Sequence, residues 1–135
     1  MRMLGVDYGS ARVGLALGDT ESRIATPWSI VPNEGTLAVL ARIHEIVERD
    51  RVEAIVIGVP HPLSNAKGEN DQVREIRTFI EAVRGLNLPI HEEDEAMTSR
   101  LAARQVQESG EKGKRDDLAA AAILQSWLDR NALPS

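Results

Sequence analysis

One segment limits the possible folds more than any other. Residues Val52–Val59, with the sequence VEAIVIGV, form a nearly continuous apolar run of strand length. A strand that is apolar on both sides has to be covered on both faces of its sheet. Amphipathic segments with helical spacing flank the run, at Thr36–Asp50 and at Asn70–Arg84. The sequence therefore predicts an α/β fold, a mixed sheet with helices on both faces.

The rest of the chain fits the same architecture. Met3–Asp7 and Val13–Gly18 are apolar stretches around a turn, typical of a hairpin, and Pro27 places the weaker strand Ile24–Val31 at an edge or a bulge. A short strand is expected from Leu88, followed by helices at Met97–Glu108 and Asp116–Arg130. In the helix Thr36–Asp50 the expected core face is Leu37, Leu40, Ile43 and Val47. Residues 1–135 are expected to form one domain.

Composition excludes several classes of protein. The chain has no cysteine, which excludes disulfides, thiolate zinc sites and cysteine nucleophiles. The longest apolar run, Leu118–Leu124, is far below the roughly 20 residues of a membrane span. We therefore expect no membrane segment and a cytoplasmic protein. The net charge of −5 means that a nucleic acid would need a local basic patch.

Three acidic positions stand out because each lies at the end of a predicted element. Asp7 closes the first strand, Glu95 ends the acidic run after the last strand, and Asp116 opens the last helix next to Asp117. Each has an ordinary explanation, as a turn residue, a solvated charge or a helix cap. Together, however, they can converge on one edge of the sheet. Three carboxylates without histidine suit Mg²⁺ or Mn²⁺, and a two-metal site can hydrolyse a phosphodiester.

At this point the sequence resembles a known family. The segments that carry the resemblance are Asp7–Ala16 (DYGSARVGLA), Ile57–Pro60 (IGVP), Asp94–Ser99 (DEAMTS) and Lys114–Gln125 (KRDDLAAAAILQ). In this order they are similar to the motifs of the YqgF (RuvX) family. The resemblance implies a ribonuclease H-like fold related to the Holliday junction resolvases, and a nuclease that matures the 5′ end of pre-16S ribosomal RNA.

The resemblance also assigns residues. Carried over, the catalytic metal ligands are Asp7, Glu95 and Asp116, and the distance to Ile123–Gln125 favours Asp116 over Asp117. One position departs from the family, because Ala96 stands where the family has arginine. That departure affects substrate handling more than metal binding.

Cations close to the three acids are expected to contact nucleic acid. They are Arg12, Arg100, Arg104, Lys112, Lys114 and Arg115. Such contacts position a substrate without reading its sequence.

Two other functions stay open at this stage. The first is a non-catalytic RNA-binding assembly factor on a nuclease fold. The second is a nucleotide-binding module of the actin and sugar-kinase type, which normally needs two such domains. The sequence leaves undecided whether the substrate is RNA or branched DNA, whether cleavage is internal or terminal, and whether the chain is a monomer or a homodimer.

Overall fold

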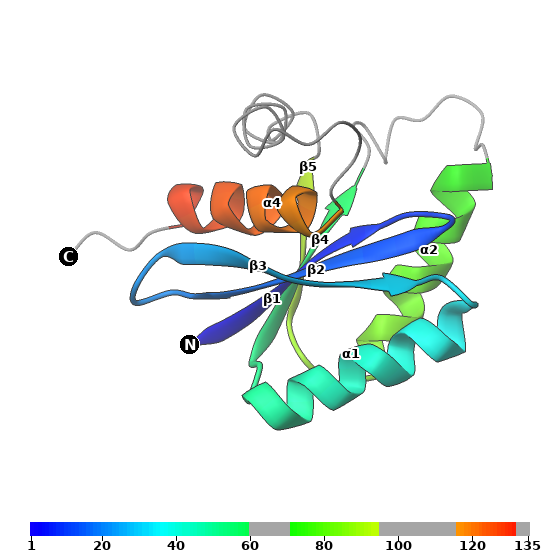
Figure 1. The fold of residues 1–135 in the computed structure, drawn as a ribbon, viewed down its shortest axis with the longest axis horizontal. Helices are drawn as coiled ribbons and strands as arrows, with labels where there is room; N and C mark the ends of the chain where they lie inside the picture. Colours follow the sequence, from blue (N-terminus) through cyan, green and yellow to red (C-terminus); the bar gives the residue numbers. More distant parts are fainter. Residues whose placement is uncertain (60–70, 95–115, 132–135) are drawn as a thin grey trace.

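The computed structural model describes residues 1–59, 71–94 and 116–131 (Figure 1). Five strands form one sheet in the order β3-β2-β1-β4-β5. The strands are β1 (Arg2–Tyr8), β2 (Arg12–Asp19), β3 (Ile24–Pro32), β4 (Ala54–Val59) and β5 (Ile90–Asp94). The helices are α1 (Thr36–Asp50), α2 (Asp71–Arg84) and α4 (Asp116–Arg130). The helix expected at Met97–Glu108 lies outside the described residues.

The sheet is mixed, as the sequence predicted. β1 pairs antiparallel with β2, and β2 with β3, whereas β1–β4 and β4–β5 are parallel pairs. β3 is an edge strand, and its register against β2 shifts between Leu15 and Ala16. Leu15 faces Ser29 and Ala16 faces Pro27, so Trp28 is the extra residue of a bulge. An edge position and a bulge are where a strand tolerates proline, which lacks a donor for the ladder.

Helices cover both faces of the sheet (Figure 1). α1 and α2 pack on one face, in a core that contains Leu4, Val6, Ile55, Ile57 and Phe79. α4 packs on the opposite face, against Met3, Ala16, Ala54 and Val56. Strand alternation explains the division, because neighbouring residues of β1 and β4 point to opposite faces. In the described part of the chain, no helix has the length and apolar character to cross a bilayer.

The expected core face of α1 is partly wrong. Leu37 is 82% exposed, whereas Val39, Ile43 and Ile46 are buried. At 3.6 residues per turn, Leu37 is about 120° around the helix from Ile43, while Val39 and Ile46 lie within about 60° of it. The sheet contacts this narrower stripe, flanked by Leu40 and Val47, and Leu37 and Ala38 stay exposed to solvent.

Candidate metal centre

Asp7 lies at the carboxyl end of β1, on the face covered by α4. Met3 of the same strand packs in the α4 core, and a Cβ added to Gly5 would touch Leu124 and Ala120 of α4. Asp7 follows Gly5 by two residues, so strand alternation turns its half-buried side chain to the same face. Its cross-strand partner on β2 is Gly14.

Gly14 brings the first residue of α4 onto the sheet. A Cβ built on Gly14 would lie 1.9 Å from the carbonyl oxygen of Asp116 and 2.9 Å from its Cβ. Only a residue without a side chain allows the helix to begin this close to β2. Because Gly14 is also the partner of Asp7, Asp7 and Asp116 come together at one point of the sheet.

The two aspartates at the start of α4 have different hydrogen bonds. Both are buried, and both stand in the first helical turn, where a negative charge is stabilised by the helix dipole. The Oδ2 of Asp116 accepts a hydrogen bond from the Nε of Arg12 at 2.8 Å. The Oδ1 of Asp117 accepts one from the backbone N–H of Leu118 at 3.0 Å. The bond from Arg12 links Asp116 to the first residue of β2.

Arg12 is the only one of the six expected nucleic-acid contacts that falls among the described residues. It is the first residue of β2, and its side chain is 56% exposed while it bonds to Asp116. The other five are Arg100, Arg104, Lys112, Lys114 and Arg115, which lie outside the described residues. The structure therefore places one cation directly at the acidic centre.

The described donors suit a hard divalent cation. Asp7 and Asp116 offer carboxylate oxygens, the ligands that Mg²⁺ and Mn²⁺ prefer. Within residues 1–59, 71–94 and 116–131, no group of three or more acidic, histidine or cysteine side chains could hold a metal ion. The third expected ligand, Glu95, lies outside them. Glu95 directly follows Asp94, the last residue of β5. Because β1, β4 and β5 run parallel, Asp94 and Asp7 both lie at the carboxyl ends of these strands.

Glu93 has a structural role that the sequence did not reveal. Its side chain is 0% exposed, and its carboxylate accepts hydrogen bonds from Ser126 Oγ at 2.6 Å and from the guanidinium of Arg130. Beside it the rings of His91 and Trp127 lie 4.8 Å apart. These contacts attach β5 to α4. In the sequence Glu93 is one member of an acidic run, and nothing there indicates a partner on the last helix.

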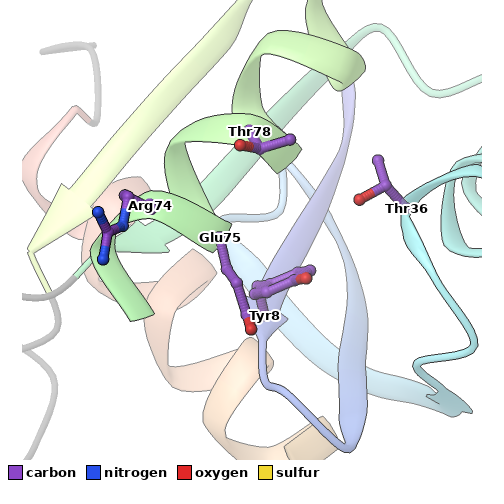
Figure 2. Close-up of a pocket in the computed structure, with 5 residues that line it drawn as sticks. All are labelled: Tyr8, Thr36, Arg74, Glu75 and Thr78. Atoms are coloured by element: carbon purple, nitrogen blue, oxygen red, sulfur yellow. The ribbon is translucent and has the colours of Figure 1, made fainter. Parts of the chain in front are cut away.

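A polar hollow lies on the other face of the same strand end (Figure 2). Tyr8 follows Asp7 but turns toward α2, with its ring 4.6 Å from that of Phe79. The cavity measures about 380 Å³. It is lined by Tyr8, Thr36, Arg74, Glu75 and Thr78. Hydroxyl, guanidinium and carboxylate groups make it a site for polar groups, separate from the Asp7–Asp116 pair.

Comparison with known proteins decides the family. A family model described as RuvX, Holliday junction resolvase, matches residues 1–130. The chain belongs to the RuvX family. Proteins of this family are nucleases that act on phosphodiester bonds, and the chain is an enzyme of that class. The prediction of a YqgF (RuvX) nuclease is thereby confirmed.

Relatives align with this RuvX-family chain over almost its full length. A protein of Maridesulfovibrio salexigens is 35% identical, covering 96% of this chain and 99% of the relative. One of Anaeromyxobacter dehalogenans is 37% identical, covering 98% and 99%. Both carry the name "Putative pre-16S rRNA nuclease".

Solved structures show the same fold. Thermus thermophilus RuvC in complex with a Holliday junction superposes with a TM-score of 0.62 at 17% identity, over 93% of this chain and 92% of RuvC. The fowlpox virus resolvase bound to junction DNA gives 0.57 at 14% identity, over 96% and 98%. The predicted ribonuclease H-like fold is confirmed.

Proposed function

We propose that this chain is a divalent-metal-dependent nuclease whose ligands are Asp7, Glu95 and Asp116, and whose substrate is the 5′ region of pre-16S ribosomal RNA. The packing of Asp116 on Gly14, directly beside Asp7, is the observation that carries the metal site. Two aspartates from distant parts of the chain thus both lie next to Gly14, one on β1 and one at the start of α4. Glu95 is proposed as the third ligand because it follows the last residue of β5.

One or two Mg²⁺ or Mn²⁺ ions held by these carboxylates would activate a water molecule and stabilise the leaving oxygen of the phosphodiester. The chain itself supplies position. Asp7 is fixed by the β1–β2 ladder, and Asp116 by its backbone contact with Gly14. In hydrolysis the water oxygen forms a bond to phosphorus, the bond from phosphorus to the leaving oxygen breaks, the water gives up a proton and the leaving oxygen takes one up from the solvent. Carboxylates fixed in this way would lower the activation barrier, because the metal-ligating oxygens would need no rearrangement during the reaction.

The nucleic acid is proposed to approach along cations around this centre. Arg12 is half-exposed beside Asp116. We propose that Arg100, Arg104, Lys112, Lys114 and Arg115 continue the path, as their sequence positions near Glu95 and Asp116 suggest. A local path is required because the chain as a whole carries a net charge of −5.

The names of the relatives support ribosomal RNA as the substrate, since both are named for pre-16S rRNA. This assignment places the protein in the cytoplasm, where ribosomal RNA precursors are processed in bacteria. Branched DNA is the second candidate, supported by the family description and by the likeness to resolvases bound to junctions. A two-fold symmetric junction would favour a homodimer, because each copy supplies one centre.

The substrate is tested by cleavage of three end-labelled molecules: a structured pre-16S RNA fragment, single-stranded RNA and a four-way DNA junction. Each is incubated with the protein in Mg²⁺, Mn²⁺ or EDTA. The proposal expects metal-dependent cutting that is fastest on the pre-16S fragment. Faster cutting of the junction would assign the second candidate. Tight RNA binding without cutting in any metal would contradict the proposed reaction and indicate an assembly factor.

A further inference from the structure

The Arg12–Asp116 contact joins a proposed substrate-binding cation to a proposed metal ligand. The Nε of Arg12 donates to the Oδ2 of Asp116 at 2.8 Å, a short, charge-assisted geometry. The side chain of Asp116 is only 12% exposed, whereas that of Arg12 is 56% exposed. The carboxylate is thus fixed in the protein, while the guanidinium reaches it from solvent.

We infer that Arg12 exchanges partners when the site is loaded. In the chain without a cation it neutralises Asp116. When a divalent cation occupies the Asp7–Asp116 site, Arg12 turns to a phosphate of the substrate. The inference rests on the proposed metal site, and it assigns to Arg12 a coupling between metal binding and nucleic-acid binding.

Three physical arguments support the exchange. The hydrogen bond occupies one of the two carboxylate oxygens that Asp116 can offer to a cation at this site. A guanidinium and a divalent cation repel each other when both are next to Asp116. A free guanidinium offers five N–H donors in a plane, a geometry that matches phosphate oxygens.

The backbone of Arg12 stays in place during such an exchange. Arg12 is paired with Pro32 of β3, and the N–H of Asn33 donates to the carbonyl oxygen of Ala11 at 3.0 Å. Only the side chain has to rotate. Its new partner would therefore be a phosphate close to the acidic centre.

A positioning role and a competing role predict opposite changes in metal affinity. If Arg12 only held Asp116 in place, its loss would loosen the ligand and weaken metal binding. If Arg12 competes with the cation, its loss strengthens metal binding. Mn²⁺ binding without any nucleic acid, followed by electron paramagnetic resonance, separates the two.

The test compares Arg12→Gln with Arg42→Gln, which removes an arginine from an exposed ion pair with Glu45 on α1, on the opposite face of the sheet from α4. We expect Arg12→Gln to bind Mn²⁺ roughly 3- to 10-fold more tightly than wild type. Arg42→Gln and the charge-conserving Arg12→Lys should stay within about 2-fold of wild type. Thermal unfolding of each variant checks that the fold is kept.

A second measurement follows the freed guanidinium. Binding of a labelled four-way junction and of a labelled RNA is measured by fluorescence anisotropy in EDTA and in Ca²⁺, with substrate integrity checked on gels. The wild-type protein should bind both nucleic acids more tightly in Ca²⁺ than in EDTA. In Arg12→Gln most of this increase in affinity should be lost.

Unchanged or weaker Mn²⁺ binding by Arg12→Gln would overturn the exchange while leaving the metal site intact. Loss of Mn²⁺ binding in Asp116→Asn would support the site itself. If wild type binds no Mn²⁺ at all, both the exchange and the metal part of the proposed function are wrong.

Discussion

Replacing Gly14 with alanine is expected to displace the start of α4 and so disable the site. The new Cβ would lie 1.9 Å from the carbonyl oxygen and 2.3 Å from the carbonyl carbon of Asp116, whereas real Cβ atoms stay beyond about 3.0 Å. β2 is held between β1 and β3, so the helix has to move by about 1 Å. Overpacking of this kind costs about 1–3 kcal/mol, which lowers Tm by about 3–11 °C. A 1 Å misplacement of a catalytic group costs about 100-fold in rate.

Gly18→Ala is the matched control, since Gly18 lies on the same strand and faces the same helix. Its added Cβ would approach Leu124 Cδ2 at 2.8 Å and Leu128 Cδ1 at 3.3 Å, which are ends of flexible side chains, and Ile24 O at 3.1 Å. Melting curves, Mn²⁺ binding and single-turnover cleavage are measured for both variants. We expect Gly18→Ala to keep Mn²⁺ binding and cleavage. If Gly14→Ala melted within 1 °C of wild type and cut at full rate, the contact between β2 and α4 would not be what places Asp116.

Three further predictions concern stability and substrate binding. Arg130→Met leaves the Glu93 carboxylate buried without its cation and should lower the free energy of unfolding in urea by about 2 kcal/mol, and adding Glu93→Leu should restore most of that loss. If the single and double variants are equally unstable, the buried pair is refuted. Leu37→Gln should change the free energy of unfolding by less than about 0.5 kcal/mol, whereas Ile43→Ala should lower it by about 2–5 kcal/mol. Similar losses for both variants would show that Leu37 belongs to the core. Nucleic-acid affinity should fall steeply with salt, and Arg12→Gln in Ca²⁺ should reduce the slope of log K against log[salt] by about 1; a flat response would remove the basic path.

Much of the fold could be predicted because local patterns of apolar and polar residues determine which residues are buried. All six residues of β4 are buried, as the apolar run required, and Pro27 lies at an edge-strand bulge because proline lacks a ladder donor. The start of α4 at Asp116 was also predicted, from an acidic pair that precedes an apolar stretch. In each of these cases the physical cause of the structure lies within a few consecutive residues of the sequence.

Features that depend on distant partners could not be predicted. The acidic run that ends at Glu95 was interpreted as solvated charge or as part of a metal site, but Glu93 within it is buried and paired with Arg130. Arg12 was predicted to face nucleic acid, and its bond to Asp116 depends on how α4 sits on Gly14. Periodicity alone also misplaced Leu37, because several stripes of α1 fit a helical spacing and only the contact with the sheet selects one.

The central claim, that Asp7 is a ligand of a metal-dependent nuclease centre, is tested most directly by single-turnover cleavage in Mn²⁺ with Asp7→Asn. Asp19→Asn is the matched control. Asp19 is the last residue of β2 and pairs with Arg2, so it lies at the opposite end of the β1–β2 pair from Asp7. We predict that Asp7→Asn keeps its melting temperature but loses at least about 100-fold in cleavage rate, while Asp19→Asn cuts like wild type. Cleavage by Asp7→Asn at the wild-type rate would contradict it.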